Sequence, residues 1–229
     1  MDDQAAATSD RQIWDRHWQA MQGESSLFGR LASLVRRRIL RGAVRHYAER
    51  WLPPTGVLVE AGCGTGEASA GLPRRQRRLL GLDFSLPVLL VARRRGPYDW
   101  CVVGDLHQLP FAAGAISGAW NLGVLEHFPA EEGIRILREL RRSLVPGGVA
   151  VLFWPPELGL SRWVLAPVEA VRSLLGRRRF RFFPGEVNRL RTRRQGRATL
   201  AAAGLEPLCV EVSPRDAFIH MVLVARRAA

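Results

Sequence analysis

The chain has 229 residues, of which 47% are hydrophobic and 24% charged, and this composition is typical of a globular protein with one main core. No apolar run reaches the roughly 18 residues of a membrane-spanning helix, and the acidic start lacks the basic and apolar regions of a signal peptide, so we expect a cytoplasmic protein. The formal net charge of +13, with 34 arginines and no lysine, is compatible with a nucleic-acid partner, an anionic membrane or an ordinary solvated surface.

Residues 1–50 are expected to form a helical segment that covers a site or packs on the main domain, which we expect to span residues 51–229. Aromatic side chains gather at residues 13–18. Over residues 31–51, apolar side chains recur at steps of three and four with arginines between them, which predicts an amphipathic helix packed on a sheet. Prolines and a glycine at residues 53–56 end this helix.

The next stretch, residues 57–66, has the sequence VLVEAGCGTG. It predicts a buried strand that opens into a loop with glycine at every second position, where the backbone adopts positive φ and approaches another molecule closely. A dinucleotide fingerprint has the spacing G-x-G-x-x-G, and here Glu67 occupies the place of its last glycine. The motif therefore indicates either a different ligand or a generic glycine turn.

This motif resembles the first motif of the class I S-adenosylmethionine-dependent methyltransferases, and especially the small-molecule enzymes of ubiquinone and menaquinone biosynthesis. The resemblance covers residues 50–154 well. It implies an α/β, Rossmann-like, doubly wound fold with a mostly parallel seven-stranded sheet, one antiparallel strand in a C-terminal hairpin, and a helical insertion. It also implies S-adenosylmethionine as cofactor, bound by Gly62, Gly64 and Gly66, while Glu60 orients the loop and the methionine ammonium. The alternative for Glu60 is a solubilising acid at a strand end.

A second strand is expected at residues 79–83, after a short helix that ends near residue 72. Its last residue, Asp83, lies about 20 residues beyond the first glycine, which is the separation at which β-α-β units deliver an acid to ribose hydroxyls. A carboxylate accepts hydrogen bonds from both hydroxyls of a vicinal diol. The resemblance adds Phe84 to the cofactor-binding residues.

A third strand, predicted at residues 100–103, leads into a loop at residues 104–111. The resemblance implies that Asp105 accepts a hydrogen bond from the adenine amino group and that the backbone N–H of Leu106 donates to a ring nitrogen. The alternative is that Asp105 is a turn residue that caps its own loop.

A fourth strand at residues 116–121 is expected to end at the chemical centre, because strands one and four flank the switch point of such a sheet. The resemblance adds Asn121 to the cofactor-binding residues. His127 follows closely and is the candidate general base, since an unperturbed imidazole with a pKa of about 6.5 accepts a proton at neutral pH. The alternative is a histidine that packs or hydrogen-bonds beside the cofactor.

Residues 155–189 match no element of the basic sheet and are expected to form an insertion over the active face. An apolar part is followed by arginines and phenylalanines at residues 177–183. This pairing suits the headgroup boundary of an anionic bilayer, so we predict that residues 155–183 contact a membrane or a hydrophobic acceptor. Alternatively, their apolar face closes over the protein's own core. A last helix and two strands are expected to complete the sheet.

Together these features predict an S-adenosylmethionine-dependent methyltransferase acting on a small, hydrophobic or lipid-like molecule. Methyl transfer is an in-line displacement, for which an enzyme mainly aligns the reactants and excludes water. Two alternatives stay open, namely an RNA-directed methyltransferase or nucleic-acid binder, for which the basic charge argues, and a noncatalytic adenosyl-binding module. The three cysteines, Cys63, Cys101 and Cys209, form no C-x-x-C pair, so reduced thiols and no metal site are predicted.

Overall fold

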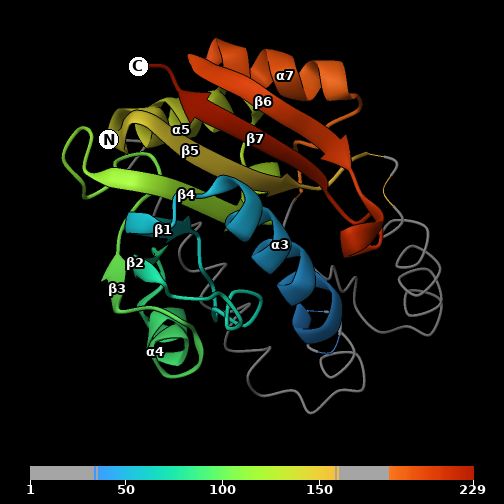
Figure 1. Cartoon of the computed structure of the whole chain (residues 1–229). Coiled ribbons are helices and arrows are strands. Elements are labelled where there is room, and N and C mark those ends of the chain that lie inside the picture. Colours follow the sequence, from blue (N-terminus) through green and yellow to red (C-terminus); the bar gives the residue numbers. More distant parts are fainter. Residues whose placement is uncertain (1–33, 35, 158, 160–185) are drawn as a thin grey trace, which may run out of the picture.

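The computed structural model describes residues 34, 36–157, 159 and 186–229. Seven strands form one sheet in the order β3-β2-β1-β4-β5-β7-β6 (Figure 1). The strands are β1 (Thr55–Ala61), β2 (Gln76–Asp83), β3 (Trp100–Val103), β4 (Ile116–Leu122), β5 (Leu144–Trp154), β6 (Leu205–Val212) and β7 (Met221–Arg227). Strand β7 is antiparallel to both of its neighbours, and the other pairs are parallel. The predicted doubly wound sheet with one antiparallel strand in a C-terminal hairpin is confirmed.

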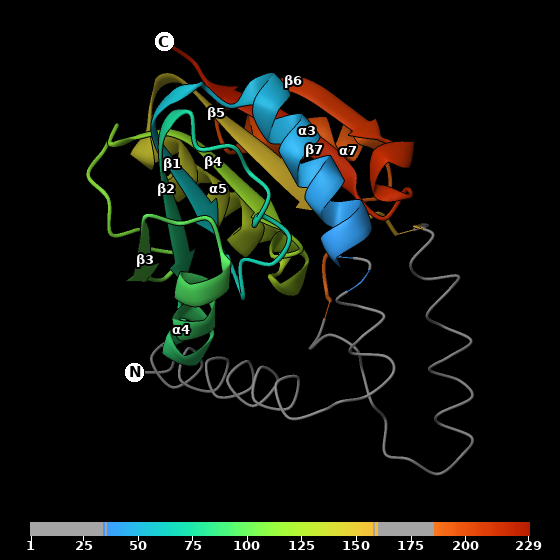
Figure 2. The ribbon, with the colours of Figure 1, turned by 60° about the horizontal axis from the view of Figure 1, so that its bottom comes forward.

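Helices cover both faces of the sheet (Figures 1 and 2). They are α3 (Arg41–Trp51), α4 (Leu86–Arg95), α5 (Ala130–Ser143) and α7 (Arg193–Ala202), with the short turns η1 (Arg36–Leu40), η2 (Leu125–His127) and η3 (Pro214–Asp216). None of the helices in the described part of the chain is long and apolar enough to cross a membrane. The predicted aromatic segment at residues 13–18 and the basic segment at residues 177–183 lie outside the described residues.

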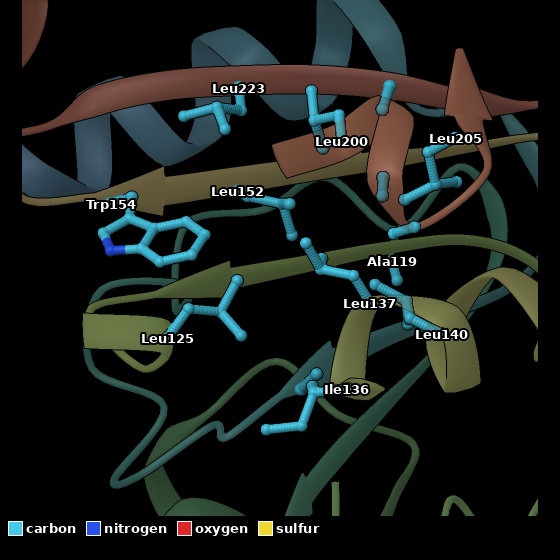
Figure 3. Packing of buried hydrophobic residues seen from close by; sticks show 14 of the residues in the cluster. Ala119, Leu125, Ile136, Leu137, Leu140, Leu152, Trp154, Leu200, Leu205 and Leu223 are labelled. Atoms are coloured by element: carbon cyan, nitrogen blue, oxygen red, sulfur yellow. The ribbon is translucent and has the colours of Figure 1, made fainter. Parts of the chain in front are cut away.

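Two hydrophobic clusters hold the helices to the sheet, one on each face. Successive strand residues point to opposite faces, so Leu58 belongs to the cluster under α3 and α4, while Val59 belongs to the cluster under α5 and α7. Figure 3 shows the second cluster, in which Leu137 and Leu140 of α5 face Leu152 of β5. Because both faces are buried, the central strands are apolar almost throughout.

The connection between β1 and β2 differs from the prediction. The short helix expected up to residue 72 is absent, and the chain instead makes consecutive turns in which the N–H groups of Gly66, Ser69 and Leu72 each donate to the carbonyl three residues earlier. Gly62, Gly64 and Gly66 all have positive φ, so a right-handed helix cannot begin before residue 67. Too few residues then remain before Pro73 to form a stable helix.

Arg77 ties β2 to the end of α3. Its side chain is buried, with Nε 2.8 Å from the carbonyl oxygen of Pro53 and Nη2 3.0 Å and 3.2 Å from those of Leu52 and Ala48. Ala48 is in the last turn of α3, and its carbonyl oxygen also accepts from the N–H of Leu52, the residue that ends the helix. The side chain of Arg77 therefore fixes the end of α3 against β2.

Candidate active site

The predicted site residues meet at one edge of the sheet, where the parallel strands β1 to β4 end. The N–H groups of Gly62 and Cys63 both donate to the carbonyl oxygen of Leu82, at 2.8 Å and 2.9 Å. The N–H of Gly104, after β3, donates to the carbonyl oxygen of Asp83 at 3.0 Å. Backbone hydrogen bonds therefore join the ends of three strands into one continuous surface.

At two positions of the glycine loop, neighbouring side chains of the protein leave no room for any residue but glycine. Gly62, Gly64 and Gly66 have φ values of +76°, +51° and +69°, as the motif predicted. A Cβ on Gly62 would lie 2.7 Å from Cγ2 of Val124, and a Cβ on Gly66 would lie 2.7 Å from Cε2 of Tyr98. Internal packing thus requires glycine at both positions, a cause that the motif did not reveal.

Asp83 links this loop to the start of α4. One carboxylate oxygen accepts a hydrogen bond from the N–H of Gly64 and the other from the N–H of Ser85, both at 3.0 Å. The side chain is buried, and Phe84 beside it is half-buried. Asp83 thus lies at the end of β2, where the acid for the ribose hydroxyls was predicted, and its contact with ribose stays a prediction.

Asp105 is exposed and caps its own loop. Its Oδ1 accepts from the N–H of His107 at 2.9 Å and lies 2.9 Å from the His107 ring nitrogen Nδ1, a contact that raises the pKa of His107. The capping alternative is therefore observed, and the predicted contact of Asp105 with adenine stays a prediction. Leu106 directs its side chain into the core, which leaves its backbone as the part available for the predicted role.

Asn121 and Glu60 lie on opposite faces of the sheet. Trp120 pairs with Glu60 in the β1–β4 register, so Asn121 points to the other face, where it lines a small cavity with Ala61 and Leu106. Its Oδ1 is buried and has no hydrogen-bond partner among the described residues. The structure thus brings Asn121 near the end of β3 and separates its side chain from that of Glu60.

Glu60 is only 3% exposed, so the alternative of a solubilising acid at a strand end is wrong. Its carboxylate accepts a hydrogen bond from the hydroxyl of Tyr98, and burial raises its pKa to about 7. Nearby, Nε1 of Trp120 donates to Oγ of Ser69 at 3.0 Å. Sequence reasoning missed Tyr98, which is distant from the glycine motif in the chain, and Ser69, which follows the motif closely but belongs to no recognisable pattern.

His127 lies in η2, directly after β4, with its side chain 9% exposed. Its Nε2 is 3.8 Å from Oε1 of Glu126. Glu126 is buried, its Oε2 has no hydrogen-bond partner among the described residues, and burial raises its pKa to about 8. Its carbonyl oxygen accepts from the N–H groups of Val187 and Asn188 at 2.8 Å and 3.0 Å. Sequence reasoning missed Glu126, although an acid beside a histidine after a strand was a usable signal.

The charge of this edge is opposite to that of the whole protein. The segments that meet there are residues 60–66, 83–85, 104–106 and 121–127, and they contain four acids and no arginine, in a chain of net charge +13. Such acceptors suit a cationic ligand with hydroxyl groups, whereas a pyrophosphate requires N–H donors or positive charge. This set of acceptors therefore fits an adenosyl sulfonium better than a dinucleotide.

Comparison with known proteins gives a family model described as "Methyltransferase domain", which matches residues 59–152. The chain is 33% identical over 108 residues to a probable tRNA methyltransferase 9B of Bos taurus, covering 45% of this chain and 22% of that protein. It is 32% identical over 150 residues to a 2-phytyl-1,4-naphtoquinone methyltransferase of Thermosynechococcus vestitus, covering 58% of this chain and 64% of that protein. The chain thus spans about a fifth of the first relative and less than two thirds of the second.

Among solved structures, the chain is similar to a magnesium protoporphyrin IX methyltransferase from Synechocystis PCC 6803 with bound SAH. The TM-score is 0.66 at 21% identity, and the match covers 97% of this chain and 100% of that protein. At this identity the likeness establishes the fold.

The buried Glu126 predicts a stability that falls as the pH rises. Its pKa is raised from the ordinary 4.5 to about 8, so the protonated carboxyl stabilises the fold at low pH, and this contribution is lost as the pH rises through about 8. We expect that, from about pH 6 to 8.5, the free energy of unfolding falls by about 2 kcal/mol more in the wild-type protein than in the Glu126→Gln variant. Urea unfolding at these pH values measures the difference.

Glu139→Gln is the matched control for this measurement. Arg142 holds the pKa of Glu139 below its ordinary value, so this variant should keep the wild-type loss of stability over the same pH range. An equal loss in wild type and Glu126→Gln would contradict the prediction.

Proposed function

Residues 59–152 belong to the class I S-adenosylmethionine-dependent methyltransferases, and from this premise we propose that the protein transfers a methyl group from S-adenosylmethionine to a small-molecule acceptor. The observation that carries the proposal is the set of strand-end acids around a glycine loop, in segments without arginine. Cationic and hydroxyl-bearing parts of the cofactor suit this set of acceptors.

In this proposal, the ends of three strands hold different parts of the cofactor. Asp83 accepts hydrogen bonds from the ribose hydroxyls, and its carboxylate also accepts from the N–H groups of Gly64 and Ser85. Asp105 and the backbone of Leu106 recognise adenine, and Glu60 attracts the methionine ammonium. Phe84 and Asn121 complete the contacts. When bound, the cofactor supplies an activated methyl group.

The proposed chemistry requires little from the protein beyond alignment, exclusion of water and removal of one proton. His127 is the proposed acceptor of that proton at Nε2 or Nδ1, since it follows β4 and is largely screened from water. The neighbouring carboxyl of Glu126, whose pKa is about 8, is mainly neutral at pH 7 and so adds little negative charge beside the imidazole.

The acceptor that we favour is hydrophobic or lipid-like. The similarity to a naphthoquinone methyltransferase supports it. The composition of residues 155–183 also supports it, since apolar residues and arginines suit peripheral contact with an anionic membrane. Most of this segment lies outside the described residues, so the membrane contact rests on composition.

RNA is the second candidate acceptor. The net charge of +13 and the similarity to tRNA methyltransferases over 108 residues favour it. A noncatalytic adenosyl-binding protein would share the same glycine and acid residues but would transfer no methyl group.

The first test of the proposal is cofactor binding, measured by calorimetry with S-adenosylmethionine and its demethylated product. Asp83→Ala should weaken binding by about 1 to 3 kcal/mol, because it leaves polar partners unpaired. Gly64→Val should abolish binding, since valine does not adopt a φ of +51°. Gly114→Val has equal backbone strain at φ +68° in open space away from the site and should bind normally. Tight binding of NAD in place of both ligands would refute the assignment.

The second test separates chemistry from binding at His127. If the imidazole accepts the proton, His127→Ala should lower kcat by about 10²- to 10⁴-fold and leave the cofactor affinity nearly unchanged. His46→Ala, on the helix α3, is the control and should keep the wild-type rate. Wild-type turnover in a folded His127→Ala protein would leave the packing alternative standing.

The third test identifies the acceptor. Incubation with methyl-labelled cofactor and a cell extract, followed by separation into lipid, small-molecule and RNA pools, should place the label in the lipid or small-molecule pool. Co-sedimentation with anionic but not neutral vesicles would support the membrane contact. Label in RNA, together with a salt-sensitive mobility shift, would favour the second candidate, and a cofactor that binds without transfer would indicate the noncatalytic alternative.

A further inference from the structure

Tyr98, which is distant from the glycine motif in the sequence, packs against the glycine loop in the fold. Tyr98 lies between α4 and β3, and it is buried with its hydroxyl donating to Oε2 of Glu60. We propose that Tyr98 is a positioning residue for the cofactor, whose ring sets the shape of the glycine loop and whose hydroxyl holds the Glu60 carboxylate. This inference rests on the proposed function, because it concerns the same cofactor.

The ring of Tyr98 fits a hollow made by three glycines from separate parts of the chain. A Cβ on Gly66 would lie 2.7 Å from the ring, one on Gly81 would lie 2.9 Å from it, and one on Gly96 would lie 2.4 Å from it. Real Cβ atoms do not approach this closely, so the loop after β1, the middle of β2 and the end of α4 all pack directly on the aromatic ring. The position of Gly66 in the cofactor loop therefore depends on Tyr98.

The hydroxyl of Tyr98 donates a hydrogen bond to the carboxylate of Glu60, whose other neighbours are acidic or neutral. The groups that face Glu60 are Tyr98, Asp83 of β2, Cys63 of the loop, and the pair formed by Ser69 and Trp120. Burial is the largest effect and favours the protonated form of Glu60, as does the charge of Asp83 to a smaller extent, while the hydrogen bonds from Ser69, Tyr98 and Trp120 favour the ionised form. Tyr98 thus helps to keep a buried carboxylate available for a cation.

This arrangement couples cofactor binding to a proton. The pKa of Glu60 is about 7, so close to neutral pH a part of the molecules carries a protonated Glu60. A ligand with an ammonium group favours the ionised carboxylate, so binding should release protons and should strengthen as the pH rises from about 6 to 8. Without the Tyr98 hydroxyl the pKa of Glu60 rises, and the pH range of strong binding moves upward.

The experiment compares Tyr98→Phe with Tyr47→Phe, using the demethylated product of S-adenosylmethionine as ligand. Tyr47 is a matched control, since it is fully buried in the same hydrophobic cluster and its hydroxyl donates to Glu211 at 2.5 Å, away from the glycine loop. Calorimetry in buffers of different ionisation enthalpy gives both the Kd and the number of protons released. At about pH 7, Tyr98→Phe should raise Kd about tenfold and release more protons than wild type, and Tyr47→Phe should change neither.

Glu60→Gln shows whether Tyr98 acts through the carboxylate. This variant should abolish the pH-dependent proton release, and Tyr98→Phe should add little to the Kd of Glu60→Gln, since the two changes remove one interaction. Proton release that persists in Glu60→Gln, or a wild-type Kd and proton count in Tyr98→Phe, would overturn the inference while the proposed function stands. Failure of the wild-type protein to bind the ligand at any pH would overturn the proposed function, and the inference with it.

Discussion

The site depends on a steric constraint, namely that the loop after β1 passes between two side chains that leave no room for a Cβ. Gly62 lies against Val124 and Gly66 lies against Tyr98. Val124 immediately precedes η2, which carries Glu126 and His127, so the loop is packed against the segment that we propose for chemistry. Tyr98 connects the other side of the loop to Glu60. A larger residue at Gly62 would clash with Val124, and one at Gly66 would clash with Tyr98.

The second organising feature is a local reversal of charge. The chain has 34 arginines, yet none is in the four segments that meet at the carboxyl ends of the strands. Several arginines instead hold structure in place, as Arg77 does at the end of α3 and as Arg142 does by donating to the carbonyl oxygen of Phe111 at 2.8 Å. The acidic edge therefore differs in charge from the rest of the chain. A basic surface for RNA or lipid and an acceptor-rich cofactor site are compatible in one protein.

Two buried carboxyls give the site an unusual electrostatic character. Glu60 and Glu126 are each 3% exposed, and burial raises their pKa values to about 7 and about 8. They differ in their partners, since Glu60 accepts from Tyr98, whereas Oε2 of Glu126 has no hydrogen-bond partner in the described part of the chain. Buried carboxyls with raised pKa values are common at functional sites. The charge of the site therefore changes with pH near neutrality, as Glu60 and Glu126 gain or lose a proton.

The sequence by itself indicated the apolar strands and the acids at their ends, and its resemblance to a known family implied the sheet with a single antiparallel strand. Apolar runs followed by Glu60, Asp83 and Asp105 are local patterns, and parallel strands bring their carboxyl ends to one edge whatever the details of packing. Tertiary structure alone decided which side chains surround those acids. Tyr98 reaches Glu60 across 38 residues, Asn121 faces away from it, and turns replace the helix that was predicted to end near residue 72. Such contacts depend on which strands become neighbours and on which face each side chain points to, and neither is contained in a local pattern of residues.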